Sequence, residues 1–454
     1  MMKRQILVLA GAFFATSLFA QAFSGGSGTA EDPYLISSVA DLKELSSMVD
    51  TPGEGDTQQT YGKCFKLTQD ITEPLKYMIG LEGFFRGDFN GDGHCITVDI
   101  SMPTDDYVGL FGTVKTGAVH DLAVKGTVEG RRYVGAIVAN PTNGARLYNL
   151  VNYATVTSSY TSLAYVGGIV GGIVSHTDGS LSGAIVNNCA NYGTVVCDGS
   201  AVGGVIGYSG QAVGNTISDI ANYGDVVNKG SARVGGVIGN PLYNDVVHRV
   251  VNFGTVSSEK ISGCLGNSNP TDLGEIFYDK QYAYNIYGVP AQEKNTSEMT
   301  ATGMQNDLGD TWTYADALLP RPVMGGFEDS DIAVLYAAPV MLADGDNLRN
   351  VTRDFSLSLG NSSYGSVSWT AKNGLVEIQP DGKVVLKSSG DEVLTSSLNG
   401  ATRNIAITVN LSDGISGIAV GSKTSGGWYN LNGQRVDSRT KGILIHNGKK
   451  VVVR

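Results

Sequence analysis

A short apolar phrase recurs through the middle of this 454-residue chain and constrains its fold more than any other feature. In its clearest copy the phrase reads Val166-Gly167-Gly168-Ile169-Val170-Gly171. Successive copies lie 26, 32, 36, 32 and 27 residues apart and begin at Val108, Val134, Val166, Val202, Val234 and Ile261. A unit of about 30 residues repeated this often is typical of a solenoid, in which each unit packs only on its neighbours.

A second phrase follows each of the first five copies, as in Asn191-Tyr192-Gly193-Thr194-Val195. Short Val and Ile runs bounded by Gly, Asn and Ser indicate strands and turns, not helices. We therefore expect an all-β fold, a parallel β-helix with one coil per repeat and coils about 4.8 Å apart. Four copies keep an asparagine that would form a hydrogen-bonded ladder or else be a surface turn residue: Asn152, Asn191, Asn222 and Asn252.

An aromatic residue follows each of these asparagines, and the four are the candidate ligand-binding residues of the repeats: Tyr153, Tyr192, Tyr223 and Phe253. Two interpretations are open. The stacked rings would fill a core or corner of the rod, or they would form an exposed strip that binds sugar rings.

The beginning of the chain predicts export. Lys3 and Arg4 precede an apolar run over residues 6–19, and Ala20-Gln21-Ala22 fits a cleavage site, so residues 1–22 are expected to be a signal peptide. No later stretch is long and apolar enough to span a bilayer. The expected location is the outer cell surface or the extracellular space. The net charge of -11 argues against nucleic acid as a partner.

The five cysteines are expected to be free thiols, because Cys189 and Cys264 align with interior apolar positions of other repeats. No CxxC pair supports a structural zinc site, and none of the five histidines is part of a His-Glu-x-x-His motif. We expect no cofactor, with calcium as the one alternative.

The calcium alternative rests on Asp88, Asn90 and Asp92, with Asp99 in twelfth place. This spacing fits a calcium-binding loop, but strands and not helices are expected on both sides. A Gly-rich hairpin turn is the competing interpretation.

The chain divides into parts of different character. Residues 23–100 are expected to hold lead-in strands and a capping helix, with Ser37 or Ser38 as N-cap and Val39, Leu42, Leu45 and Val49 on its apolar face. The repeats occupy 101–270, and aromatics in 271–336 would close the far end of the rod. Short alternating strands predict a small Ig-like sandwich at 337–411 with Trp369 in its core, and a β-module with hairpin turns at 432–433 and 447–448 fills 412–454.

The two repeated phrases, with the opening Gly-Gly-Ser-Gly-Thr-x-x-Asp-Pro-Tyr-Leu-Ile, resemble the GLUG repeats of bacterial surface proteins over about residues 23–319. Residues 337–411 are similar to bacterial Ig-like domains. The tail is similar to C-terminal modules of exported Bacteroidetes proteins, some of which are type IX sorting signals. The resemblance implies an exported surface or extracellular product.

Two functions compete. The first is a non-enzymatic, monomeric surface or secreted protein whose rod serves adhesion or binds host or community glycans or surface proteins. The alternative is a polysaccharide lyase or glycoside hydrolase on a β-helix, which needs acids clustered on one exposed face. Asp219 and Asp225 are interpreted as solvated surface acids, so the sequence favours the non-enzymatic function and names no catalytic residue.

Overall fold

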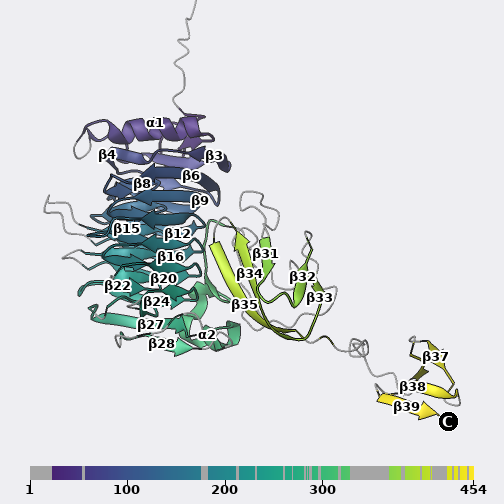
Figure 1. Ribbon diagram of the computed structural model, residues 1–454. Helices are drawn as coiled ribbons and strands as arrows, with labels where there is room; N and C mark the ends of the chain where they lie inside the picture. Colours follow the sequence, from purple (N-terminus) through teal and green to yellow (C-terminus); the bar gives the residue numbers. More distant parts are fainter. Residues whose placement is uncertain are drawn as a thin grey trace, which may run out of the picture. The chain divides into compact units, whose positions relative to one another are not determined.

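The computed structural model shows a parallel β-solenoid of about seven turns, followed by smaller antiparallel sheets (Figure 1). The described residues are 23–53, 57–174, 183–210, 214–230, 233–258, 261–267, 269–280, 283, 285, 289–294, 298–314, 319–327, 368–379, 384–398, 401–409, 411, 427–431, 434–437, 440–446 and 449–453. The expected signal peptide at 1–22 therefore lies outside them.

The rod consists of three parallel sheets, of which the largest has 16 strands. The long strand β9 (Ala118–Gly130) joins two rows of stacked strands in this sheet. Its first half pairs with β12 and its second half pairs with β13. The other strands of this first sheet are β1 (Tyr34–Ile36), β2 (Cys64–Leu67), β3 (Ile71–Leu75), β5 (Asp88–Asn90), β6 (Cys95–Met102), β12 (Arg146–Asn152), β13 (Thr155–Ser158), β16 (Ile185–Asn191), β17 (Val195–Cys197), β20 (Thr216–Asn222), β21 (Val226–Asn228), β24 (Val246–Asn252), β25 (Val256–Ser257), β27 (Asp272–Asp279) and β28 (Gln292–Lys294).

The second and third sheets have six strands each. The second comprises β7 (Tyr107–Val108), β10 (Tyr133–Gly135), β14 (Tyr165–Gly167), β18 (Ala201–Gly203), β22 (Arg233–Gly235) and β26 (Ile261–Ser262). The third comprises β4 (Ile79–Phe85), β8 (Phe111–Lys115), β11 (Val138–Thr142), β15 (Val170–Ile173), β19 (Ile206–Ser209) and β23 (Ile238–Asn240).

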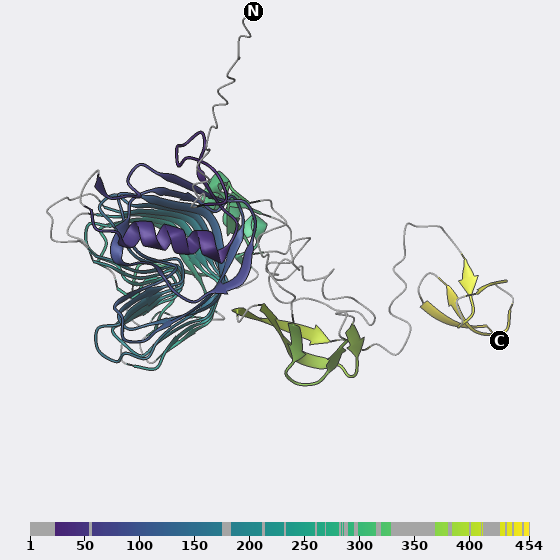
Figure 2. The ribbon, with the colours of Figure 1, turned by 90° about the horizontal axis from the view of Figure 1, so that it is seen from above.

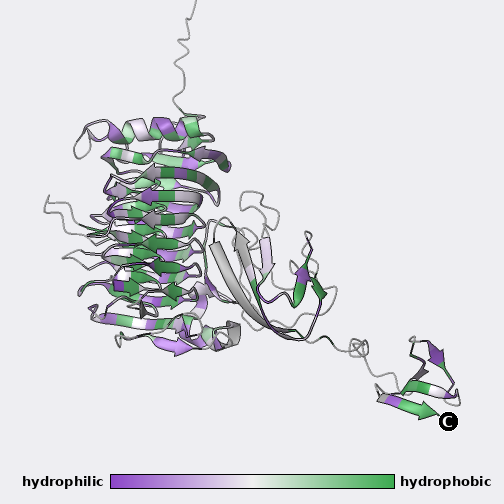
Figure 3. Ribbon diagram, in the orientation of Figure 1, coloured by the Kyte–Doolittle hydropathy of each residue, from purple (hydrophilic) through white to green (hydrophobic). Residues whose placement is uncertain are grey.

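The repeated phrase sets the register of the second sheet. Its first residue pairs with the first residue of the next copy all along the rod, from Val108 through Val134, Val166, Val202 and Val234 to Ile261. The five valines of this column are at most 1% exposed. Hydrophobic residues recur in the strands of successive coils (Figure 3). The predicted parallel β-solenoid and its repeat register are confirmed.

The two phrases recur together because they touch inside the rod. Asn152, Asn191, Asn222 and Asn252 are fully buried, and each Nδ2 donates to the next Oδ1 at 2.8, 2.7 and 2.8 Å. The second glycine of the first phrase lies directly against this ladder, as Gly204 does against Asn222. A side chain on Gly204 would overlap the amide, so the ladder needs glycine there. The ladder, not the surface turn, is the observed arrangement.

The N-terminal end of the rod is covered by α1 (Val39–Asp50), which lies across it in the view from above (Figure 2). Ser38 is the N-cap, and its Oγ accepts from the backbone N–H of Asp41 at 3.2 Å. Leu42, Leu45 and Val49 are buried in the rod's core. The predicted capping helix is therefore present with the expected apolar face, although Val39 is only partly buried.

Residues 271–327 lie partly at the far end of the rod and partly on its outer face. β27 continues the first sheet in register with β24, so the stack extends beyond residue 270. The chain then forms α2 (Ala301–Leu308), η3 (Gly309–Thr311), β29 (Trp312–Thr313) and β30 (Arg321–Pro322) on the outer face of the first sheet. We call residues 298–314 and 319–327 the strap. Tyr278, Ala283 and Val289 are buried in the rod's core beyond the last repeat, whereas Trp312 and Leu319, expected at the far end, instead cover an apolar strip on the outer face.

The region after the strap is antiparallel. β31 (Ser368–Ala371), β34 (Gly390–Leu398) and β35 (Ala401–Val409) form one sheet, and β32 (Val376–Ile378) pairs with β33 (Val384–Leu386). Trp369 is partly buried against their core. The strand predicted near 355–359 lies outside the described residues.

Residues 410–454 form a separate compact unit. β36 (Trp428–Tyr429) pairs antiparallel with β37 (Arg435–Val436), and β38 (Gly442–His446) pairs with β39 (Lys449–Val453). These strands flank the two predicted hairpin turns, whose own residues lie outside the described set.

All five cysteines are free thiols, as predicted, and Cys189 and Cys264 are buried in the core. Among the described residues, no helix combines the length and the apolar character that crossing a bilayer requires.

Candidate functional site

A band of polar side chains follows the outer face of the first sheet from β5 to β27. Its members sit in register on successive coils and alternate with buried residues such as Val119, Leu147 and Ile217. We call this band the polar strip, and it comprises Asp88, Asn90, His120, Asp121, Arg146, Tyr148, Asn149, Asn187, Asn188, Thr216, Ser218, Asp219, His248, Arg249, Asp272 and Glu275.

One column of the polar strip has left-handed backbone. Six successive coils place a non-glycine residue there with φ between 51 and 56°: Asp121, Asn149, Asn188, Asp219, Arg249 and Glu275. Asp and Asn tolerate this conformation better than most residues. These residues do not pair with the neighbouring strands of the sheet. Each strand therefore bends at this residue and turns the residue's side chain outward along the face.

At the N-terminal part of the strip, His120 is held between two carboxylates. Its Nδ1 contacts Asp121 at 2.6 Å and its Nε2 contacts Asp88 at 3.0 Å, while Tyr148 stacks on the ring at 4.6 Å between centroids. Burial lowers the pKa of His120, but the hydrogen bonds and charges of Asp121 and Asp88 outweigh it and raise the pKa to about 9. The imidazole is thus a buried cation at neutral pH.

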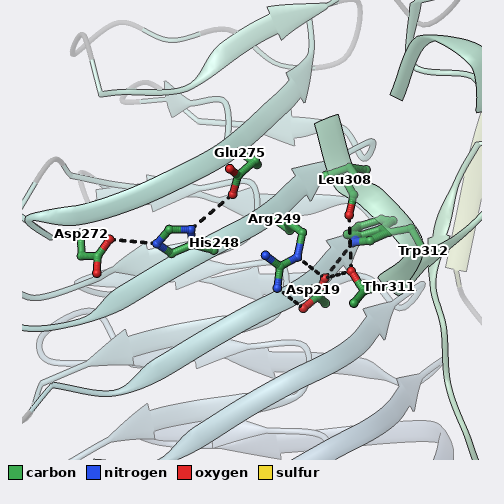
Figure 4. Close-up of polar contacts among 8 residues, drawn as sticks. All are labelled: Asp219, His248, Arg249, Asp272, Glu275, Leu308, Thr311 and Trp312. Atoms are coloured by element: carbon green, nitrogen blue, oxygen red, sulfur yellow. Dashed lines mark hydrogen bonds and ion pairs between the residues drawn. The ribbon is translucent and has the colours of Figure 1, made fainter. Parts of the chain in front are cut away.

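At the other end of the strip, His248 makes a similar but exposed contact with two acids (Figure 4). Its Nε2 lies 2.9 Å from Asp272 and its Nδ1 lies 3.3 Å from Glu275. The side chains of Asp272 and Glu275 are 61% and 42% exposed, so solvent reaches both carboxylates. His120 and His248 occupy the same register position four coils apart.

Asp219 lies next to this cluster and fastens the strap (Figure 4). It accepts two hydrogen bonds from Arg249, at 2.6 and 2.8 Å, one from the Thr311 hydroxyl at 2.6 Å and one from Trp312 Nε1 at 3.1 Å. Burial opposes its ionisation, but these bonds and the Arg249 charge hold the pKa of Asp219 below its usual value. The interpretation of Asp219 as a solvated surface acid is wrong, because the strap covers it and leaves it 3% exposed. Asp225 is half-buried.

The aromatic column of the second phrase lies beneath the strap. Tyr153, Tyr192, Tyr223 and Phe253 stack with centroids 4.6–5.2 Å apart and are at most 2% exposed. They pack with Trp312, Leu319 and other strap residues, and the Tyr223 hydroxyl donates to the Pro320 carbonyl at 2.5 Å. Core packing is therefore the observed arrangement. No ring face is open to a sugar, so these four residues do not form a sugar-binding strip on the surface.

The four residues of the calcium alternative have separate partners. Asp88 contacts His120, the Asn90 side chain accepts from the Asp92 backbone at 2.7 Å, Asp92 pairs with Lys66 at 3.0 Å, and Asp99 accepts from Thr127 at 3.1 Å. The described part of the chain contains no group of three His, Cys, Asp or Glu residues placed to hold a metal ion. A turn at residues 92–93 does join β5 to β6, but it is not the expected hairpin, because both strands pair in parallel with β9 and not with each other.

The polar strip offers hydrogen-bonding groups in a fixed line. Asn149, Asp219 and the amide oxygen of Asn187 are buried, whereas Arg146 and Thr216 are exposed to solvent. Such exposed groups, held on rigid strands, suit recognition of an extended polar ligand. The sequence analysis missed the strip because its members share a register position but not a residue type. The steps between repeats could have aligned them.

No family model matches the chain. It is similar to "Putative Gly-rich membrane protein" of Evansella cellulosilytica, with 36% identity over 133 residues, which make up 26% of this chain and 14% of that protein. It is also similar to Halomucin of Haloquadratum walsbyi, with 30% identity over 164 residues, 32% of this chain and 2% of that protein. Among solved structures, "Crystal structure of a putative immunoglobulin A1 protease from Bacteroides ovatus" matches with a TM-score of 0.45 and 18% identity, covering 68% of this chain and 96% of that one.

Proposed function

We propose that this chain is an exported, non-enzymatic binding protein whose β-solenoid presents the polar strip to extended glycans at the outer cell surface or outside the cell. The observation that carries the proposal is the strip itself. Seven strands, from β5 to β27, contribute outward side chains at matching positions, so the members of the strip that the strap leaves exposed recur along the rod. A polymeric ligand can meet the same face on several coils at once.

The state of the acids supports binding over hydrolysis. Each carboxylate of the strip already holds a basic side chain: Asp88 and Asp121 hold His120, Asp272 and Glu275 hold His248, and Asp219 holds Arg249. A glycoside hydrolase needs a carboxylic acid and a carboxylate free to act on the scissile bond. Here such a role would first require an ion pair to break.

Export rests on residues 1–22 and on the resemblance to GLUG surface proteins. We propose that residues 412–454 act as a sorting module, which a deletion of these residues and fractionation of the host cells would test. Retention of the shortened chain inside the cell is expected, and unchanged export would contradict the module's role.

A glycan array probed with the purified chain tests the proposed function. We expect binding to extended glycans, with no release of reducing ends from any of them. Reducing ends released on incubation would contradict the non-enzymatic assignment, and a lack of binding to every glycan would contradict the ligand class.

A further inference from the structure

A second line of stacked tyrosines lies on the rod, away from the strap. Tyr107, Tyr133 and Tyr165 each precede the first valine of the repeated phrase and pair in register on β7, β10 and β14. Because those valines are buried, strand alternation turns the tyrosines outward. Their rings stack with centroids 4.9 and 5.1 Å apart and planes 7 and 18° from parallel.

The fourth ring comes from another sheet. The residue that follows Tyr165 in register is Ala201, whose small side chain leaves the next place in the stack open. Tyr208 of β19 occupies that place, with its ring 4.6 Å from that of Tyr165. We call Tyr107, Tyr133, Tyr165 and Tyr208 the tyrosine ladder.

Two guanidinium groups lie near the tyrosine ladder. Arg233 follows Ala201 in register, is exposed, and donates to Asn240 at 2.9 Å. Arg132 lies over the Tyr133 ring at 5.3 Å from its centroid and 3.6 Å from Asp106.

The ladder differs from the buried aromatic column in the state of its hydroxyls. Those of Tyr133, Tyr165 and Tyr208 make no hydrogen bond to the described residues, and none is among the buried polar atoms without a partner, so they reach solvent. Burial of the rings raises the pKa of Tyr133 to about 12 and also raises that of Tyr208, so both remain protonated donors at neutral pH. In the buried column, by contrast, the Tyr223 hydroxyl is already bonded to the strap.

We propose that the tyrosine ladder is a binding site for an extended acidic polysaccharide, which accepts hydrogen bonds from the hydroxyls of Tyr133, Tyr165 and Tyr208 and forms ion pairs with Arg132 and Arg233. The spacing selects the ligand. The stacked rings that carry the hydroxyl donors have centroids 4.6–5.1 Å apart. An extended peptide repeats its carbonyls on one side only every second residue, about 6.6 Å apart, and falls out of step. One sugar ring per coil keeps pace, and carboxylates are the stronger acceptors for O–H and guanidinium donors.

The test measures binding of polygalacturonate to the full chain by calorimetry at low ionic strength. Tyr165→Phe keeps the stack and removes one hydroxyl, and we expect it to weaken binding about 5- to 10-fold. Tyr192→Phe, the matched change in the buried column, should leave the affinity unchanged. The fully methyl-esterified polymer, which lacks the carboxylates, should bind at least about tenfold more weakly.

The inference would be overturned by a lack of polygalacturonate binding to the unmodified chain, by equal affinities for Tyr165→Phe and the unmodified chain, or by equal affinities for the charged and esterified polymers. This site is separate from the polar strip. A bulky Thr216→Arg change in the strip should leave polygalacturonate binding intact. If it abolishes binding instead, the ligand lies on the strip, and the ladder assignment fails while the proposed function stands.

Discussion

Asn191→Ala is the change that tests most directly what holds the rod together. The Asn191 side chain accepts from Asn152 Nδ2 at 2.8 Å and from the Gly193 backbone at 3.2 Å. It donates to the Gly193 carbonyl at 2.9 Å and to Asn222 Oδ1 at 2.7 Å. All four bonds lie in the fully buried interior, where no water replaces them.

The expected cost follows from this count. A hydrogen bond contributes about 1 kcal/mol net, and a buried group left without its partner costs about 1–3 kcal/mol. After the change Asn222 Oδ1 loses its donor, whereas Asn152 Nδ2 keeps its bond to the Ala154 carbonyl at 3.0 Å. We therefore expect Asn191→Ala to lower the free energy of unfolding by about 3–5 kcal/mol.

The assay is urea unfolding followed by far-UV circular dichroism, with Asn187→Ala as the matched control. Asn187 lies on the same strand, but it faces outward and its Oδ1 has no partner among the described residues. Its replacement should change the free energy of unfolding by less than about 0.5 kcal/mol. Equal effects of the two changes, or a loss below about 1 kcal/mol for Asn191→Ala, would refute the ladder as a major source of stability.

Three further predictions address the glycine contact, the strap and pH. Gly204→Ala places a methyl group against Asn222 and should destabilise the fold by about 3 kcal/mol, whereas Gly325→Ala, which meets only one atom at 3.6 Å, should be neutral in the same unfolding assay. Asp219→Ala removes the partner of Trp312 and should expose that indole to fluorescence quenchers and the strap to proteases; unchanged quenching would count against the anchoring role. The pKa of His120 is raised to about 9 in the folded protein, so protonated His120 stabilises the fold fully below about pH 6.5. This contribution, up to about 3 kcal/mol, is lost as the pH rises to about 9. His120→Gln should remove this pH dependence of the free energy of unfolding.

The architecture of the rod could be predicted from the sequence because its determinants are local and repeated. The apolar phrase fixes the second sheet's register, and alternation puts Val134 and Val166 inside. One asparagine that recurs at one position of the repeat indicated the Asn ladder, although a surface turn explained the same pattern. The helix over residues 39–50 could be predicted from its N-cap residue and its apolar face.

The strap could not be predicted because its contacts are non-local. Trp312 meets Asp219 across 93 positions of the chain, and no periodicity records that pairing. For the same reason the sequence left the aromatic column open between core and surface. The aromatic column faces outward from the sheet and is buried only because the strap, a distant segment of the chain, covers it.

The polar strip and the tyrosine ladder could not be predicted from the sequence, for different reasons. In the polar strip, His120, Tyr148, Asn187, Ser218 and His248 share a position but not a chemistry, so no motif appears. In the tyrosine ladder, three tyrosines are visible before the repeated phrase. The fourth comes from the third sheet and fills a gap above an alanine, which only packing reveals.

The central claim, that the polar strip binds extended glycans without cleaving them, is tested most directly by the affinity of an array-selected glycan for two matched variants. Thr216→Arg places a long side chain in the strip, whereas Thr157→Arg places the same side chain on β13, outside the strip. The account predicts at least about tenfold weaker binding for Thr216→Arg in calorimetry and an unchanged affinity for Thr157→Arg. Equal affinities for the two variants would contradict it.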